Sequence, residues 1–417
     1  MIRPIALSIF LAGCASAETV TQQSAMSPAP DCRLVIVGGA LDKDNGEVWS
    51  AFLDAARELG DIAIVPAASG YPSGSGQAAK EAMVHNGWPE DRIRVLPLAV
   101  KDDPDTEDID ESGWEGNAET PAVVEALESA AGIWFTGGDQ ARIAELFGTA
   151  NARRPALVAS QKACRNGAVI GGTSAGAAIM SKTMIVGGDS LPTLLGATDP
   201  DEGALATEVG LGFFPRGIID QHFGERAREG RLLSALARLE SEDDRIGFGV
   251  DEDTGLVVEP DGVITVTGSG QVTVIDARRT ALSRNSDHLS ADAVTLHLIS
   301  RGDRFDLPTE RLIPADWRKS TLGDEYFDAP SVAGTGIAVP QPKYSELLGD
   351  GLLDNSAATQ LTRFTFTPSG EGFAFTFTQV PESQGYWGRD ENGRAAYTLA
   401  NIRLDIRPMT ARMETSE

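Results

Sequence analysis

Short, wholly apolar runs that alternate with amphipathic stretches constrain this chain most strongly. The runs Leu34–Val37 and Ile62–Val65 are apolar at every position, so we predict strands that are covered on both faces. Between them, residues 47–59 place Trp49 and Phe52 on one face at helical spacing. Strands of this kind, separated by helices, build a parallel sheet with helices on both sides. The first run ends in the pair Gly38–Gly39, which lacks the spaced third glycine of a dinucleotide fingerprint.

The apolar period shifts towards two after about residue 255, which predicts short antiparallel strands such as Val263–Val266 and Val272–Ile275. Two later runs, Phe373–Phe377 and Ala396–Ile406, predict a further β-rich piece. A chain of 417 residues can hold two or three average domains, or one large domain with an appendage. We divide the chain into a signal peptide (1–17), a tether (18–31), a main α/β domain (32–318) and a β-rich C-terminal extension (319–417).

The first residues predict export from a bacterial cell. Arg3 supplies a positive charge and Ile5–Leu11 a short apolar core, too short for a retained membrane span. Residues 11–14 resemble a lipoprotein box, which predicts a lipid anchor at Cys14 and a periplasmic or extracellular location. The alternative is cleavage by an ordinary signal peptidase after Ala15–Ala17.

Charge and cysteine content limit the partners that this chain can have. The formal net charge is −26 with no basic patch to offset it, which argues against a nucleic-acid partner. Cys32 and Cys164 remain after processing; they could pair in an oxidising compartment, or Cys164 could be a buried free thiol. We expect no metal or other cofactor, because there is no HExxH motif and the histidines and cysteines are scattered.

A strand-to-helix junction carries the strongest candidate for chemistry. The apolar run Ala168–Ile170 leads into Gly172-Thr-Ser-Ala-Gly176 and then a helix-forming stretch. This is a G-x-S-x-G pattern in the context of a nucleophile elbow, with Ser174 as the nucleophile. The alternative is a Gly/Ala-rich turn that packs closely against a neighbour. An oxyanion hole would use the N–H groups of Ala175 and of Gly138 in an earlier turn.

A nucleophilic serine needs a base, and His222 is our candidate among four histidines. It ends an apolar strand, Gly217–His222, which we predict to lie in the same sheet as Ser174. The acid of the triad should lie between Ser174 and His222, on a loop that can fold over the serine. Five carboxylates qualify by position: Asp189, Asp199, Asp201, Glu202 and Glu208.

Several blocks of residues stand out together along the chain. They are residues 135–140, 171–178, 220–223 and 249–254, together with Arg226, Arg228 and Arg231. These blocks resemble the signature blocks of the cyanophycinases, which belong to peptidase family S51 together with the aspartyl dipeptidases. The resemblance covers about residues 33–310 and implies a fold like the class I glutamine amidotransferases, a flavodoxin-like mostly parallel sheet between helices, with serine in place of cysteine.

The resemblance also implies an activity and a set of site residues. It implies a serine exopeptidase that cuts cyanophycin, multi-L-arginyl-poly-L-aspartate, into β-Asp-Arg dipeptides through an acyl-Ser174 intermediate, with His222 as the base. Arginine forks bind carboxylates, and acidic residues can receive the guanidinium of the substrate. The positions that match the substrate pocket of the family are Gln140, Asp220, Gln221, Arg226, Arg228 and Arg231.

The resemblance leaves two candidates for the acid of the triad. Asp189 suits the spacing in the aspartyl dipeptidases, whereas the cyanophycinases use a glutamate slightly further on, for which Glu202 is the rival. We predict Asp189. Two other functions stay open: an isoaspartyl or aspartyl dipeptidase, and a non-catalytic binding protein on the same fold. Residues 319–417 have no counterpart in the minimal enzyme and could extend the pocket, form a homodimer contact, or cover exposed sheet.

Overall fold

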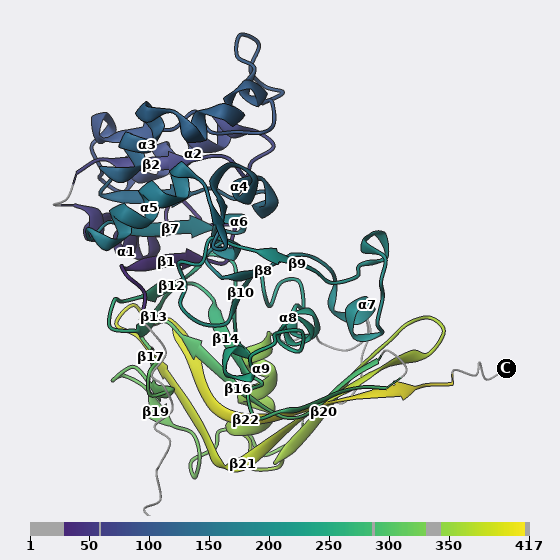
Figure 1. Cartoon of the computed structure of the whole chain (residues 1–417). Helices are drawn as coiled ribbons and strands as arrows, with labels where there is room; N and C mark the ends of the chain where they lie inside the picture. The colour runs from purple at the N-terminus through teal and green to yellow at the C-terminus, as the bar shows by residue number, and fades with distance from the viewer. Residues whose placement is uncertain (1–28, 58–59, 286–287, 331–342, 413–417) are drawn as a thin grey trace, which may run out of the picture.

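The computed structural model describes residues 29–57, 60–285, 288–330 and 343–412. Two nine-stranded sheets organise this part of the chain, and Figure 1 shows the helix-rich N-terminal half above a strand-rich C-terminal half. The predicted signal peptide and the lipid anchor at Cys14 lie outside the described residues. In the described part, no helix is long and apolar enough to cross a membrane.

The first sheet has a parallel half and an antiparallel half, as the change of apolar period predicts. Its parallel strands, in spatial order, are β1 (Leu34–Val37), β7 (Val169–Thr173), β4 (Gly132–Phe135), β2 (Ile62–Val65) and β3 (Ile93–Val95). The antiparallel strands continue from the other side of β1 as β12 (Thr254–Val258), β13 (Val263–Gly268), β17 (Arg304–Asp306) and β18 (Arg311–Ile313).

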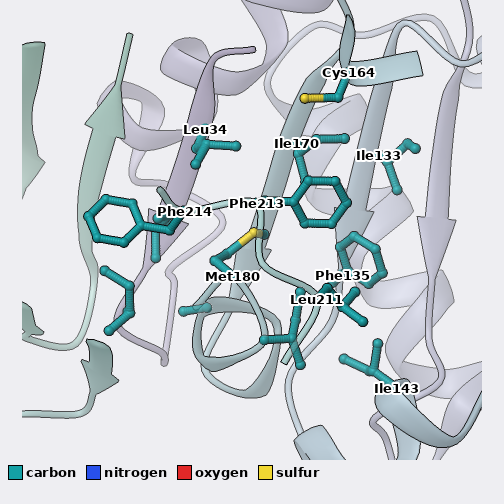
Figure 2. Packing of buried hydrophobic residues seen from close by; sticks show 14 of the residues in the cluster. Leu34, Ile133, Phe135, Ile143, Cys164, Ile170, Met180, Leu211, Phe213 and Phe214 are labelled. Carbon is teal, nitrogen blue, oxygen red and sulfur yellow. The ribbon is translucent and has the colours of Figure 1, made fainter. Parts of the chain in front are cut away.

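Both faces of the parallel half are covered, which explains its wholly apolar strands. In β1, Leu34 packs into one core layer, visible in Figure 2, and Val35 packs into the layer on the opposite face. Helix α1 supplies Trp49 and Phe52 to the second layer. The helices of this half are α1 (Gly46–Ala56), α2 (Pro72–His85), α3 (Pro121–Glu128), α4 (Gln140–Phe147), α5 (Pro155–Arg165) and α6 (Ala175–Ala178). The predicted α/β core is therefore confirmed.

The second sheet joins the end of the main domain to the C-terminal extension. Its strands, in spatial order, are β10 (Ile218–Gln221), β11 (Ile246–Val250), β14 (Gln271–Asp276), β16 (His288–Ser300), β22 (Ala395–Thr410), β21 (Glu371–Arg389) and β19 (Lys319–Ser320). Strand β15 (Ala281–Asn285) pairs with β16, and β20 (Gln360–Phe366) pairs with β21. The pair β10–β11 is parallel and its neighbours are antiparallel. Helix α8 (Glu229–Leu236), helix α9 (Tyr344–Leu348) and the π-helical turn η5 (Gly349–Leu353) pack on this sheet through a shared apolar core.

This topology differs from the prediction in one respect that matters for the site. We predicted the strand before His222 to lie in the sheet of Ser174, but β10 pairs with β11 in the second sheet. Strand β22 of the extension pairs directly with β16, so the extension continues the sheet that carries β10. The β-rich character predicted for the C-terminal extension is confirmed in the part of it that the structure describes, residues 319–330 and 343–412.

Smaller elements fill the connections. The hairpin of β8 (Thr183–Gly187) and β9 (Ala206–Val209) follows α6, and α7 (Ser190–Leu194) lies within its loop. Strands β5 (Gly148–Thr149) and β6 (Ala152–Arg153) form a second hairpin. The 3₁₀ turns are η1 (Glu90–Arg92), η2 (Glu111–Glu119), η3 (Pro200–Glu202) and η4 (Glu242–Asp244).

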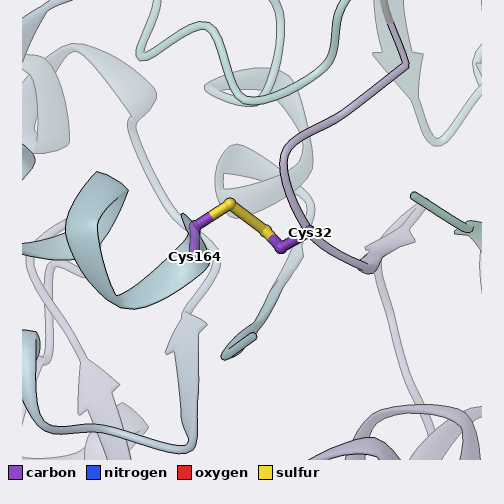
Figure 3. The surroundings of a disulfide bond; sticks show 2 residues. All are labelled: Cys32 and Cys164. Atoms are coloured by element: carbon purple, nitrogen blue, oxygen red, sulfur yellow. A yellow bond between two sulfur atoms is a disulfide. The ribbon is translucent and has the colours of Figure 1, made fainter. Parts of the chain in front are cut away.

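Cys32 and Cys164 form a disulfide, which decides between the two alternatives left by the sequence. Figure 3 shows that it joins the segment leading into β1 to helix α5. The Cα atoms are 5.1 Å apart, within the usual range for a disulfide, and both residues are buried. The bridge closes a loop with a sequence separation of 132 residues.

Candidate active site

Ser174 lies between strand β7 and helix α6 with a backbone conformation that few residues adopt. Its φ is 53° and its ψ is −109°, outside the regions that side chains with a Cβ normally occupy. The N–H of Ser174 donates to the carbonyl of Val37 at 3.0 Å, which holds the turn against the end of β1. The residue as a whole is half-buried. This is the geometry of a nucleophile elbow.

His222 follows β10 and faces Ser174 from the second sheet. Its Nε2 lies 2.9 Å from Oγ of Ser174, a hydrogen-bonding distance. The backbone of His222 has a φ of 46°, and its N–H donates to the carbonyl of Gly38 at 2.7 Å. The ring packs on Gly39, where an added Cβ would lie 2.2 Å from Cε1 of the imidazole. A side chain at Gly39 would therefore displace the histidine.

Glu252 supplies the carboxylate at the other ring nitrogen. Its Oε1 lies 2.6 Å from Nδ1 of His222. Glu252 is the second residue after β11, and β11 runs parallel to β10, so the ends of both strands deliver their polar residues to the same edge. The side chains of Ser174, His222 and Glu252 thus form one continuous chain of hydrogen bonds.

The predicted acid, Asp189, and its rival Glu202 are not in this position. Asp189 is the residue before α7, where its N–H donates to the carbonyl of Gly203. Glu202 ends the 3₁₀ turn η3 nearby and is exposed. The physical reason for the correction is topological. The loop between Ser174 and His222 packs its α7 on α8, and the strand next to β10 brings Glu252 to the histidine instead.

The turn at the end of β1 binds the three chain segments that carry Ser174, His222 and Glu252. Three successive carbonyls, of Val37, Gly38 and Gly39, accept N–H groups from Ser174, His222 and Asp253 at 3.0, 2.7 and 2.8 Å. One turn therefore fixes the backbone of the serine, of the histidine and of the residue after Glu252. The pair Gly38–Gly39, which is not a dinucleotide-binding fingerprint, therefore aligns the backbone of the candidate site.

Two further carboxylates tie the loop after His222 to the loop that carries Glu252. Oδ1 of Asp251 accepts the N–H of Gly224 at 2.9 Å, and Oε2 of Glu225 accepts the N–H of Glu252 at 3.2 Å. Each loop thus offers a carboxylate to the backbone of the other. Burial and the nearby charge of Glu225 raise the pKa of Asp251 to about 6.

The surroundings of His222 favour its neutral form. Burial of the ring lowers its pKa below the ordinary value, and the charges of Arg226 and Arg228 act in the same direction. The hydrogen bond to Glu252 raises the pKa and so opposes these effects. A neutral imidazole that donates Nδ1–H to a carboxylate has a free lone pair on Nε2, which can accept a proton from the hydroxyl.

The backbone groups predicted for an oxyanion hole lie beside the serine. Ala175 is the first residue of α6, where N–H groups have no partner within the helix. The turn that contains Gly138 is adjacent, because a Cβ added to Gly137 would lie 3.3 Å from the Cβ of Ser174. The structure thus brings Gly138, Ala175 and Ser174 into one region.

Four of the six predicted substrate-pocket residues turn their side chains into the protein. Asp220 and Arg231 are 1% and 5% exposed and form a bidentate ion pair. Gln140 donates to the carbonyl of Ile185 at 2.6 Å, and Gln221 accepts from Nη1 of Arg228 at 2.9 Å. All four side chains are buried and have partners within the protein, so we assign them to the framework around the site, which corrects the prediction.

Of the two remaining arginines, Arg226 is open to a ligand, because it is exposed four residues after the histidine. The side chain of Arg228 is 11% exposed and donates from Nη1 to the side chain of Gln221. Burial lowers the pKa of Arg228 to about 10, with a contribution from the charge of Arg231, so this guanidinium remains a cation at neutral pH. Both charges act on His222, which places them within electrostatic range of the reacting groups.

The prediction from the sequence missed Glu252 as the acid of the triad, although the sequence contains a signal for it. Residues 249–254 stand among the blocks of the resemblance, and Glu252 follows an apolar strand just as His222 does. The carboxyl ends of neighbouring parallel strands meet at one edge of a sheet, so two such strands predict a shared site. The assumption that the acid precedes the histidine excluded Glu252.

A serine at a strained strand-to-helix turn, a histidine and a carboxylate in line are the arrangement of a serine hydrolase. Within the described ranges, no group of three or more His, Cys, Asp or Glu side chains could hold a metal ion. The fold and the site together therefore define the protein class as a serine hydrolase.

A family model and two relatives agree with this class. Residues 114–266 match the model of peptidase family S51. A cyanophycinase from a Nostoc species is 32% identical over 297 residues, which cover 69% of this chain and 90% of the relative. A cyanophycinase from Geminocystis herdmanii is 33% identical over 286 residues, covering 67% of this chain and 94% of the relative. A crystal structure of a peptidase from an acI-B1 Actinobacterium aligns with a TM-score of 0.46 and 18% identity, over 67% of this chain and 98% of that one.

The chain belongs to peptidase family S51, in the group of the cyanophycinases, and it is a hydrolase that acts as a peptidase. The resemblance drawn from the sequence is confirmed.

Proposed function

We propose that this protein hydrolyses cyanophycin to β-Asp-Arg dipeptides by acyl transfer through Ser174. The observation that carries the proposal is the continuous chain from Oγ of Ser174 through His222 to Glu252, with distances of 2.9 and 2.6 Å. An activated serine, a base and a group that orients the base are the parts that this chemistry requires.

The proposed reaction has two halves. Oγ of Ser174 attacks the carbonyl carbon of the scissile amide, and Nε2 of His222 takes the hydroxyl proton. The N–H groups of Ala175 and Gly138 stabilise the oxyanion, and His222 returns the proton to the departing amine as the C–N bond breaks. Water, deprotonated by His222, then attacks the acyl-serine ester and regenerates the hydroxyl. Glu252 keeps Nδ1 protonated and stabilises the imidazolium in both halves.

The choice of substrate rests on the relatives and on an exposed arginine near the site. The two relatives described above are cyanophycinases at 32% and 33% identity. Arg226 presents an exposed guanidinium group whose charge acts on His222, and guanidinium forks suit carboxylates such as those at the end of an arginine-substituted polyaspartate.

Release of β-Asp-Arg from purified cyanophycin, followed by mass spectrometry, tests the proposal. We expect release by the wild type and a loss of at least about 10⁴-fold in Ser174→Ala. Equal release by both proteins would overturn the role of Ser174. Release from α- or β-aspartyl dipeptides, with none from the polymer, would instead show an aspartyl dipeptidase.

We also propose that the protein is exported, as the sequence of residues 1–17 predicts. The Cys32–Cys164 disulfide supports this, because disulfides persist in oxidising compartments. Cell fractionation followed by mass spectrometry of the N-terminal peptide tests export and a lipid on Cys14. Intact protein in the cytoplasm, with both thiols reduced, would contradict the proposal.

A further inference from the structure

A large cavity lies between the loop that follows His222 and the C-terminal extension. Its volume is about 1570 Å³, above the range of roughly 300–1,000 Å³ that small-molecule sites occupy. Residues of the loop, among them Glu225 and Arg226, line one end. Strands β20, β21 and β22 and helix α9, all from the extension, line a large part of the rest. Residues of α7 and α8 and of the loops around Asp251 and Gly270 complete the lining. The extension therefore helps to build a large hollow that begins at Gly224, two residues after the histidine.

Carboxylates are concentrated at both ends of this cavity. Glu225, Glu229 and Asp251 lie at the end near the candidate active site. Burial, with the charges of Asp251 and Asp220 adding to it, raises the pKa of Glu229 to about 7. A cation that enters the cavity would stabilise the charged form of this buried carboxylate.

The far end contains a pair of carboxylates that converge on one hydroxyl. The hydroxyl of Tyr397 lies 2.8 Å from Oδ1 of Asp350 and 2.8 Å from Oδ2 of Asp354, and it has a single proton for both. Asp354 is 5% exposed, and its other oxygen accepts the N–H of Tyr326. Glu346 adds a third carboxylate at this end.

Two cations of the lining, Arg301 and Arg389, are held by groups of their own. Arg301 pairs with Asp390 at 3.0 Å. Arg389 donates to the carbonyl of Gly393 at 2.7 Å and lies over the ring of Trp387. These two guanidinium groups therefore have partners other than the carboxylates described above.

Aromatic side chains form the wall between the two ends. Phe364, Phe375 and Phe377 come from β20 and β21, and Trp387 is 38% exposed. The hydroxyl oxygen of Tyr344 is buried and has no hydrogen-bond partner among the described residues. Guanidinium groups stack on aromatic faces and donate to carboxylates and hydroxyls at their edges, so the wall and its ends suit the same ligand group.

We propose that this cavity binds an arginine-bearing peptide segment, so that the extension holds part of the substrate chain next to the candidate active site. The proposal rests on the proposed function, because the bound segment would be a part of the polymer that is not being cut. Carboxylates at the two ends receive guanidinium groups. Arg226 lines the cavity and acts electrostatically on His222, so this end of the cavity lies near the reacting groups.

Calorimetric titration of the full chain carrying Ser174→Ala tests binding without turnover. The probe is N-acetyl tetra-arginine amide, with tetra-glutamate as the comparison of opposite charge. The test variant combines Asp350→Asn and Glu346→Gln, which keep the shape of both side chains. The matched control is Glu382→Gln, an exposed carboxylate on β21 that does not line the cavity.

We expect tetra-arginine to bind, tetra-glutamate to fail, and the double variant to lose at least about fivefold in affinity while the control stays within twofold. Equal affinity in the double variant and the control, no binding of tetra-arginine at millimolar concentration, or equal binding of tetra-glutamate would each overturn the proposal.

Turnover separates this proposal from the proposed function. With an active serine, the double variant should lose kcat/KM on the polymer and keep it on the shortest cleavable fragment, two linked β-Asp-Arg units. If no protein cleaves cyanophycin while tetra-arginine binding still falls in the double variant, the proposed function fails and the cavity remains a guanidinium site. If cyanophycin is cleaved and the variant behaves as the control, the cavity proposal alone fails.

Discussion

Replacing Glu252 by glutamine tests the corrected triad directly. Glutamine has nearly the same shape but carries no charge, and its amide can offer an N–H to the ring instead of an acceptor. Oε1 of Glu252 lies 2.6 Å from Nδ1 of His222, so the change acts on a single hydrogen bond. We expect the imidazole to lose its orientation and its preferred tautomer, and the imidazolium to lose its stabilising charge.

The size of the effect follows from the separation of the charges. An imidazolium and a carboxylate with charge centres about 4 Å apart attract by about 4 kcal/mol at an effective dielectric constant of about 20. Since 1.36 kcal/mol changes a rate tenfold, the loss is about 10³-fold in kcat. The side chain of Glu252 is 34% exposed, so solvent screening makes this an upper value for the charge alone.

Asp189→Asn and Glu202→Gln are the matched controls, because they remove the same charge from the predicted positions. Neither residue is the partner of His222, so we expect both to stay within about tenfold of the wild type. The assays are release of β-Asp-Arg and the rate at which a fluorophosphonate labels Ser174. A loss in Asp189→Asn equal to that in Glu252→Gln would refute the reasoning from the structure.

The pH profile gives a second and independent check. His222 acts as a base only when neutral, so activity falls as the pH drops through its pKa. Burial already lowers this pKa, and the hydrogen bond to Glu252 partly restores it. Removing the carboxylate lowers the pKa further, so the acid limb of kcat/KM should move to lower pH in Glu252→Gln. A shift to higher pH would contradict the assigned contact.

Three further changes probe the framework. Gly39→Ala places a Cβ 2.2 Å from Cε1 of His222, so we expect a fall of about 10²-fold in kcat, measured beside an unfolding curve that shows a folded protein. Arg231→Leu removes the bidentate partner of the buried Asp220 and leaves Arg228 at 3.7 Å as a weaker one, so it should cost about 3 kcal/mol in the free energy of unfolding by urea, with Arg231→Lys restoring only part. Replacing both Cys32 and Cys164 by serine should cost about 2–5 kcal/mol by the same measurement, and an unchanged midpoint would contradict a formed disulfide.

The parallel strands of the first sheet could be predicted because strands that are buried on both faces are apolar at every position. Leu34 and Val35 point to opposite core layers, so every position of β1 must be apolar. The pattern does not state which strands become neighbours. Gly217–His222 has the apolar character of a strand, and nothing in its composition distinguishes the sheet of Ser174 from the second sheet that it joins.

Ser174 and His222 were predicted from the sequence and Glu252 was not, because the sequence pattern does not show which strands pair. Ser174 and His222 carry local signals, a glycine-flanked turn and the end of an apolar strand. Glu252 depends on a strand pairing, β10 with β11, which is a property of the assembled sheet. The sequence also gives charge but not exposure, so Asp220 and Arg231 were expected to meet a ligand, whereas in the structure they meet each other.

The turn at the end of β1 explains how two sheets can hold one reactive arrangement. Ser174 belongs to the first sheet, and His222 and Glu252 follow strands of the second, so any sliding between the sheets would separate them. Successive carbonyls of Val37, Gly38 and Gly39 accept N–H groups from both sides, which fixes the two sheets against each other at this point. Because backbone groups make these contacts, the alignment survives changes of side chain, and Gly39 is needed where the ring of the histidine occupies the space of a Cβ. The strained φ values of Ser174 and His222 are consistent with this, since such conformations persist only where the surrounding structure enforces them.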